Sequence, residues 1–427
     1  MHFSETSTVL PGYSPSDVVF KLAGWLFRIS LFVLLYFDSR AWFTKSNFIE
    51  VTGAQEAFLT FLVLYFLCAV APKFLLTLKL EANGLFVLAV MAFVLVVSSC
   101  GAYLTYGQPI YAGMIEERRA LSYLIFFPVV YAIRSNRVST RTVLNYVTGA
   151  ALLCLFNAVL YYLMVSSLTA VESIASEADA RADRTPIGTG FILMALCYTL
   201  SRYVEKPKLI WALLWLGFVF DVIVLDQGRQ TIMAVAAATI ILLWGHGKAV
   251  ARLVFTCFLG LLAILPFVWN SVVNIWEKYI FLFELISHAK TLRVDTLHSA
   301  LSGNLFVPHG ALWAQWNEGF ARYFGPTFFL SDIGVFGELF CYGAILLFIL
   351  LVCFYGYIFW QIRSAEWNAV TRTCAAFVLI LLLLHTFQPV VEHGGFDIGV
   401  ILALLAGEKR RNAPPASAET DFASLTA

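Results

Sequence analysis

Charged residues are scarce in this chain of 427 residues: only 13% are Asp, Glu, Lys or Arg. An ordinary soluble domain carries about 25% charged residues. Hydrophobic residues make up 60% of the sequence, and the mean hydropathy is +0.81. So little polar surface excludes a soluble globular protein. The composition predicts an integral membrane protein, for which we expect lipid and no nucleic acid as a partner.

Paired cysteines are absent as well. The chain has eight cysteines, all within or at the edge of apolar runs and none in a CxxC pair. This distribution excludes a disulfide framework and a zinc site of the usual spacing. We expect the cysteines to act as small packing residues, and we expect no metal and no cofactor. The N-terminus lacks a short apolar region followed by a cleavage site, so residues 19–37 are expected to be a retained helix.

Long apolar runs dominate the remaining sequence. A membrane-spanning helix needs about 20 mostly apolar residues, and its backbone must be satisfied within the segment. These runs are too uniformly apolar for the alternating strands of a barrel. We therefore predict an all-α, polytopic membrane protein with about twelve transmembrane helices. The runs are 19–37, 56–72, 84–100, 119–133, 143–168, 188–203, 208–225, 230–246, 250–269, 333–360, 373–391 and 395–407.

Lys and Arg are distributed unevenly between the loops. One alternating set of loops holds about twice as many of these residues as the other, and basic loops stay in the cytoplasm. This bias places both termini in the cytoplasm. We expect one helical domain over 1–411 and a disordered tail over 412–427. Residues 270–332 form a large outer loop whose spacing suits short amphipathic helices, and 170–187 form a second outer loop that is a candidate lid.

The segment 226–231 reads DQGRQT and separates two almost wholly apolar runs. Arg229 stands there at the start of a helix, where the partial charge of the backbone is positive. An arginine at this point is unfavourable unless an anion lies beside it, such as Asp226 or a bound phosphate. A simple anchor at the membrane interface is the alternative.

Two further segments carry polar candidates. The outer loop contains Arg293 in KTLRVDTLHSALSGNLFVPHG, which ends near His309. The residues alone favour a surface helix with an internal Arg–Asp pair for this segment. Asp332 stands at the mouth of the next helix and is either a helix cap or a functional group. Glu338 lies inside the same apolar run, and a carboxylate within a membrane is a functional candidate.

The segment EERRALSYL, residues 116–124, is the last candidate. Glu116 and Glu117 precede the helix in the manner of ordinary capping residues. Arg118 and Arg119 face the outer side in the predicted topology, where they are able to guide an anionic substrate.

In its order of features the chain resembles the O-antigen ligase and polymerase superfamily, bacterial membrane enzymes of lipopolysaccharide and exopolysaccharide assembly. The matching pieces are DQGRQT before a long apolar helix, LRVDTLHSALSGNLFVPHG in a large outer loop, and SDIGVFGELFCYGAI at the start of the next helix. The resemblance covers roughly residues 180–360. It implies an architecture like that of the GT-C glycosyltransferases, with the periplasmic loop between the ninth and tenth helices, in the bacterial inner membrane.

The resemblance also implies a function. It suggests a metal-independent polysaccharide polymerase that uses an undecaprenyl-diphosphate-linked oligosaccharide at the periplasmic face. Arg229 and Arg293 would match the family's functional arginines, with Arg118 as a third diphosphate-binding residue. Asp332 is the candidate base, with His309 and Glu338 as alternatives. Ligases have a His-Asn pair where this chain has Ser331-Asp332. A ligase and a transporter of lipid-linked oligosaccharide remain the alternatives, and a flippase and chain-length regulators are possible partners.

Overall fold

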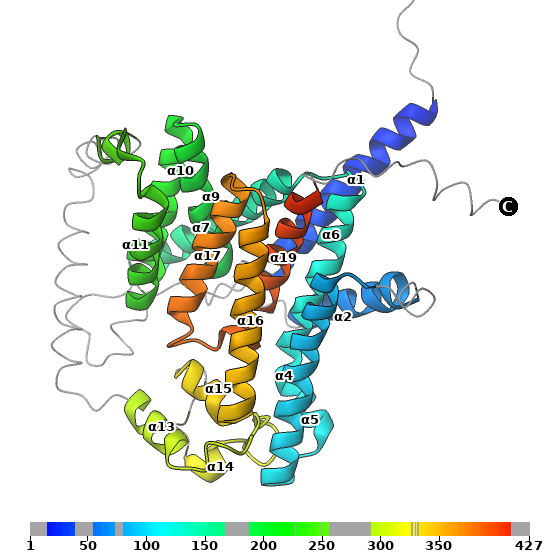
Figure 1. Cartoon of the computed structure of the whole chain (residues 1–427), viewed down its shortest axis with the longest axis vertical. Helices are drawn as coiled ribbons and strands as arrows, with labels where there is room; N and C mark the ends of the chain where they lie inside the picture. Colours follow the sequence, from blue (N-terminus) through cyan, green and yellow to red (C-terminus); the bar gives the residue numbers. More distant parts are fainter. Residues whose placement is uncertain are drawn as a thin grey trace, which may run out of the picture.

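The computed structural model in Figure 1 is a bundle of helices. The structure describes residues 15–38, 54–72, 80–166, 188–226, 228–248, 250–255, 292–325, 328, 330 and 333–410. Every regular element of three or more residues in these ranges is helical. The candidate lid at 170–187, the parts of 250–269 and 270–332 between 256 and 291, Asp332 and the tail at 412–427 lie outside the described residues.

The elements follow the predicted runs closely in most of the chain. They are α1 (Pro15–Asp38), α2 (Ala54–Tyr65), η1 (Phe66–Val70), α4 (Ala82–Tyr106), α5 (Ile110–Glu116), η2 (Glu117–Ile125), α6 (Phe126–Arg134), α7 (Thr140–Ser166), α9 (Thr189–Glu205), α10 (Leu209–Phe220), η4 (Asp221–Asp226), α11 (Arg229–Leu243), α13 (Leu292–Leu301), α14 (Ala321–Phe324), α15 (Val335–Tyr342), α16 (Ala344–Ser364), α17 (Ala369–Leu384), α18 (Val390–His393) and α19 (Gly395–Arg410).

The length and composition of these helices identify a helical membrane protein. Among the described residues, four helices are long and apolar enough to cross a membrane. Gly24–Phe37, Gln55–Val70, Arg229–Leu243 and Ala369–Leu384 are shorter apolar helices. The spanning candidates are Ala82–Tyr106, Thr140–Tyr162, Leu209–Asp226 and Ala344–Ser364.

The prediction of one continuous helix over 333–360 is wrong. Gly343 separates α15 from α16 and adopts a left-handed φ of 74°. A Cβ at this position would lie 2.9 Å from the carbonyl oxygen of Phe306, so the position also requires a residue without a side chain. The long apolar run hides the break because both sides of Gly343 are equally apolar.

The predicted helix over 373–391 also ends early. The α17 helix stops at Leu384, and a turn leads through Pro389 into the short helix α18. The predicted run at 119–133 begins as a 3-10 helix, η2, before it becomes α6. Pro128 lies in the first turn of α6 and has no N–H to give to the preceding turn, which favours a change of helix type at this point.

The C-terminal helix α19 lies at the centre of the bundle. Nearly all of its residues from Phe396 to Ala406 are buried, and it packs along η2 and α6. Glycines allow this close approach. A Cβ on Gly395 would lie 2.6 Å from Ser122 Oγ, and one on Gly399 would lie 3.0 Å from the carbonyl oxygen of Tyr123. Small residues spaced four apart are a common way for membrane helices to pack closely.

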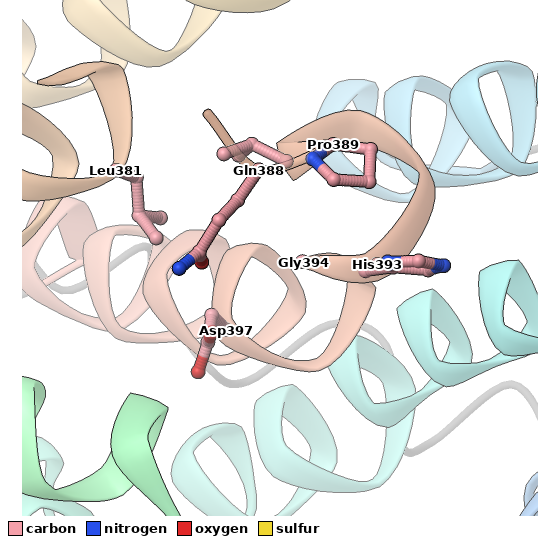
Figure 2. A pocket seen from close by; sticks show the side chains of 7 residues that line it. Leu381, Gln388, Pro389, His393, Gly394 and Asp397 are labelled. Atoms are coloured by element: carbon pink, nitrogen blue, oxygen red, sulfur yellow. The ribbon is translucent and has the colours of Figure 1, made fainter. Parts of the chain in front are cut away.

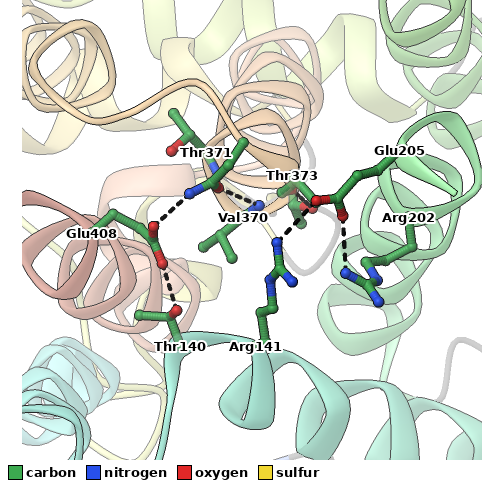
Figure 3. A network of polar contacts seen from close by, with 10 residues as sticks. Thr140, Arg141, Arg202, Glu205, Val370, Thr371, Thr373 and Glu408 are labelled. Atoms are coloured by element: carbon green, nitrogen blue, oxygen red, sulfur yellow. Dashed lines mark hydrogen bonds and ion pairs between the residues drawn. The ribbon is translucent and has the colours of Figure 1, made fainter. Parts of the chain in front are cut away.

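A polar network joins the helices at the upper end of the bundle in Figure 1. Both carboxylate oxygens of Glu205 pair with arginines, at 2.9 Å from Arg141 Nη2 and 2.9 Å from Arg202 Nη1 (Figure 3). Glu408 accepts hydrogen bonds from Thr140 Oγ1 and Asn368 Nδ2. Segments that the charge bias assigns to the cytoplasm thus meet at one end of the molecule.

The glycine contacts lead to a stability prediction. We expect Gly399→Ala to lower the free energy of unfolding by about 1–3 kcal/mol, because the added methyl group overpacks the contact with η2. The matched control is Gly356→Ala on α16, where a Cβ meets nothing within 4 Å. There, alanine should leave stability unchanged or raise it slightly. Thermal unfolding in detergent measures both, and equal melting temperatures for the two variants would contradict the close packing of α19.

Candidate functional site

A charged cavity of about 540 Å³ lies at the end of the bundle opposite the Glu205 and Glu408 network. Four parts of the chain form it: the junction of α5 with η2, residues 311–325 with Phe328 and Leu330, Cys341 of α15, and the short helix α18. Its charged lining residues are Glu116, Arg118, Arg119, Glu318, Glu392 and His393. Its aromatic lining residues are Trp313, Phe320 and Phe328.

Two adjacent arginines enter the cavity from η2. Arg118 Nη1 donates a hydrogen bond to the carbonyl oxygen of Ile115 at 2.8 Å. Its Nη2 lies 3.5 Å from Glu56 Oε1, a long contact between two half-exposed side chains. An exposed ion pair of this kind contributes little to stability. Arg118 is therefore held by its backbone contact and retains donors for a ligand. Arg119 lines the same cavity and acts electrostatically on Glu392.

The opposite wall comes from α18. Glu392 Oε1 lies 3.0 Å from His393 Nε2. Burial opposes ionisation of Glu392, but the charge and hydrogen bond of His393 and the charge of Arg119 outweigh it, so the pKa of Glu392 lies below its ordinary value. The Glu392 side chain is consequently a carboxylate at neutral pH. These residues lie outside the candidate membrane spans and the shorter apolar helices.

The glutamates before the arginines behave differently. Burial, and then the negative charge of Glu392, raise the pKa of Glu116, although Arg118 and Arg119 partly offset the rise. Burial and Glu392 also raise the pKa of Glu117 well above its ordinary value. Ser98 Oγ donates a 2.6 Å hydrogen bond to Glu117 Oε1, and the other oxygen of this buried carboxyl has no protein partner. Carboxyl groups with opposite pKa shifts are thus gathered around one cavity.

The wall formed by the segment after Gly310 is held on α4. The Ala311 N–H donates to Ser98 Oγ at 2.9 Å, so one serine contacts both this wall and Glu117. The buried side chain of Gln108 donates to the carbonyl oxygen of Ala311 at 3.0 Å and accepts from the Trp313 N–H at 2.8 Å. Gly310 has a left-handed φ of 71°, and a Cβ there would meet Ser98 O at 2.0 Å. These contacts keep the backbone leading to Trp313 in one place.

A smaller cavity of about 220 Å³ adjoins the other side of α18. His393 lines both cavities, and Figure 2 shows its ring directed away from Gln388 and Asp397, which line the smaller cavity only. The carboxylate of Asp397 lies against the first turn of α9, where a Cβ on Gly190 would be 2.8 Å from its Oδ1. A carboxylate at a helix N-terminus is favourable in its own right. We therefore place the functional site in the larger cavity.

Of the residues predicted from the sequence, the structure brings Arg118 into this cavity. His309 lies partly buried nearby, with Nδ1 2.8 Å from the carbonyl oxygen of Val307 and its ring against Phe340. Glu338 is fully buried outside the cavity lining and pairs with His385 at 2.8 Å. Arg229 is an exposed residue at the start of α11. Arg293 is the second residue of α13, and its side chain, like Asp332, lies outside what the structure describes.

Sequence reasoning missed Glu392 and His393. They occur in QPVVEHGG, a short polar break between two apolar runs. A polar break of this kind is also what makes DQGRQT a candidate. In QPVVEHGG the break is less visible, because the predicted helix over 373–391 includes the first half of the segment.

Comparisons with protein-family models, with curated proteins and with solved structures find no match to this chain. Within the described ranges, no group of three or more His, Cys, Asp and Glu side chains is arranged to hold a metal ion. Fold and cavity together define a helical membrane protein with a charged, aromatic-lined site at one end of its bundle.

The raised pKa of Glu117 leads to a pH-dependent prediction. The folded protein holds a proton that the unfolded chain loses above the ordinary pKa of glutamate, so this group destabilises the fold increasingly as pH rises toward the raised value. Glu117→Gln keeps the acceptor for Ser98 but cannot ionise. We expect this variant to melt about 2 °C or more above wild type near pH 8, and with little difference near pH 4.5. Glu366→Gln, at an exposed position near the upper end, is the control. A Glu117→Gln effect independent of pH would contradict the assignment.

Proposed function

We propose that this protein is a membrane glycosyltransferase of the polysaccharide polymerase type, which joins units of a glycan carried on undecaprenyl diphosphate. The observation that carries the proposal is the convergence of Arg118 and Arg119 with Glu116 and Glu392 on one cavity at the end of the helical bundle. In the predicted topology this end faces the periplasm, where the lipid tail of the substrate stays in the membrane and its diphosphate lies at the interface.

The two arginines are suited to the diphosphate. Guanidinium groups bind phosphate oxygens through two parallel hydrogen bonds and keep their charge at any physiological pH. In the proposed reaction, the glycosyl–oxygen bond to the diphosphate breaks and its electron pair leaves with the diphosphate. Arg118 and Arg119 neutralise the charge that develops on this leaving group. The aromatic rings of Trp313 and Phe320 supply apolar surface beside the charged groups, as in most ligand sites.

The carboxyl groups supply the proton transfer. A hydroxyl oxygen of the acceptor glycan attacks the anomeric carbon while a general base takes its proton. Glu116 is the better base in this arrangement, because its raised pKa lies closer to neutral pH than that of an ordinary carboxylate. Glu392, with its lowered pKa, stays ionised and orients His393. In this proposal Glu116 exchanges a proton with the substrate, and Glu392 keeps a constant negative charge.

The arginines are tested by the glycan profile of cells that lack the endogenous protein and carry a plasmid-borne copy. Arg118→Ala and Arg119→Ala should each reduce polymer formation about 100-fold or more at normal membrane levels, leaving single repeat units on lipid. Arg119→Lys should fall between these variants and wild type, because it keeps the charge and loses the paired hydrogen bonds.

Arg363→Ala, at an exposed position in the last turn of α16, is the matched control and should behave as wild type. Normal polymer from both alanine variants would move the site away from this cavity, with Arg229 and Arg293 as the next candidates. Polymer that forms without the protein but never reaches its final acceptor would identify a ligase instead.

Glu116 is tested by the pH dependence of transfer in membrane vesicles. The rate should fall about tenfold per pH unit below the raised pKa of Glu116, because protonation removes the base. Glu116→Gln should lower the rate about 100-fold or more and abolish this acidic limb, whereas Glu116→Asp should keep the limb. An unchanged acidic limb in Glu116→Gln would assign the base to another residue.

A further inference from the structure

A chain of buried hydrogen bonds runs beside the cavity without being part of its lining. Tyr355 OH lies 2.7 Å from His385 Nδ1, and His385 Nε2 lies 2.8 Å from Glu338 Oε2. These side chains come from α16, from the residue after α17, and from α15. Glu338 is completely buried and His385 is 4% exposed. The chain therefore joins three helices, with its Glu338–His385 link buried and Tyr355 partly buried.

The second oxygen of Glu338 holds the backbone of α18. Its Oε1 accepts a hydrogen bond from the Val391 N–H at 3.0 Å. On the other side of the same residue, the Tyr123 hydroxyl of η2 donates to the Val391 carbonyl oxygen at 2.9 Å. Val391 is thus fixed from both directions, and the next residue is Glu392, which lines the charged cavity.

The backbone around His385 adds to this arrangement. The Val335 N–H at the start of α15 donates to the His385 carbonyl oxygen at 2.9 Å. Gly334 makes the contact possible, because it has a φ of 52° and a Cβ there would lie 2.5 Å from that oxygen. Both the main chain and the side chain of His385 therefore dock α15 onto the end of α17.

The contacts leave each oxygen of Glu338 with a protein donor when the carboxylate is ionised. Val391 N–H serves one oxygen and the Nε2–H tautomer of His385 serves the other, while Nδ1 accepts from Tyr355. That tautomer is inferred from the pattern of partners. A buried side chain that is satisfied in this way and absent from the cavity lining is arranged to hold structure.

We propose that Glu338, supported by His385 and Tyr355, is a positioning residue that sets the direction in which Glu392 and His393 face the cavity. The effect on glycan transfer rests on the proposed function of the cavity, whereas the contact between Glu338 and the Val391 backbone does not.

Two substitutions separate a positioning role from a proton-transferring role of Glu338. Glu338→Gln keeps the acceptor for Val391, and its amide donates to His385 in the other tautomer. Glu338→Leu fills similar space and keeps neither bond.

The first measurement is amide hydrogen exchange of the full-length protein in detergent, followed by mass spectrometry. Peptides that contain Val391 should exchange about tenfold faster in Glu338→Leu than in wild type, because the N–H loses its buried acceptor. Glu338→Gln should exchange as wild type does. Peptides from α4 and the variant Phe336→Ala, an exposed position on the same short helix α15, serve as controls. Equal exchange in wild type and Glu338→Leu would overturn the proposal.

The second measurement is the glycan profile of the same variants. Glu338→Leu should reduce polymer at least tenfold at normal membrane levels, and Glu338→Gln should restore most of it. Loss of polymer in Glu338→Gln despite normal exchange would make Glu338 a proton-transferring group and overturn the positioning role. If the exchange results are as expected and Arg118→Ala and Arg119→Ala also make normal polymer, the proposed diphosphate site in this cavity fails while the link through Val391 stands.

Discussion

The close approach of α19 to η2 is the contact on which the charged cavity depends. Glu116 to Arg119 span the junction of α5 with η2, and Glu392 and His393 stand shortly before α19. Because Gly395 and Gly399 let the two helices meet without intervening side chains, the segments before them are brought to the same place. Larger residues at these glycines would separate the arginines from Glu392. The same helix-packing contact therefore stabilises the core and brings the charged residues of the cavity together.

The carboxyl groups at the two ends of the bundle differ in how they are paired. At the end shown in Figure 3, Glu205 and Glu408 have partners for both oxygens, and the network ties α7, α9, α17 and α19 together. At the cavity end, Glu117 has one oxygen without a protein partner, and Glu116 and Glu392 have pKa values shifted in opposite directions. Satisfied groups stabilise the fold, whereas poised groups cost stability and are typical of functional sites. This contrast is the reason for choosing the cavity beside α18 as the candidate site.

Glu338 illustrates how a sequence signal can differ from the structural role of the residue. Glu338 is recognisable in the sequence because a charge within an apolar run is costly. The structure accounts for that cost by giving the carboxylate His385 on one side and the Val391 N–H on the other. The sequence signal identifies Glu338 as a candidate, but its contacts are made with partners 47 and 53 residues away, which no local pattern reveals.

The amino-acid sequence by itself determined the helical membrane class, most helix positions and Arg118 as a candidate, because hydrophobic content and charge are local and can be summed along a segment. It did not reveal the break at Gly343, since the residues on both sides are equally apolar. Only the tertiary structure decided that residues 116–119 meet residues 392–393, and that Arg229 is exposed at the start of α11. The packing of helices that are distant in the sequence decides which polar segments lie together. Small residues such as Gly395 and Gly399 permit that packing, and a local pattern does not show which helix will pack against them.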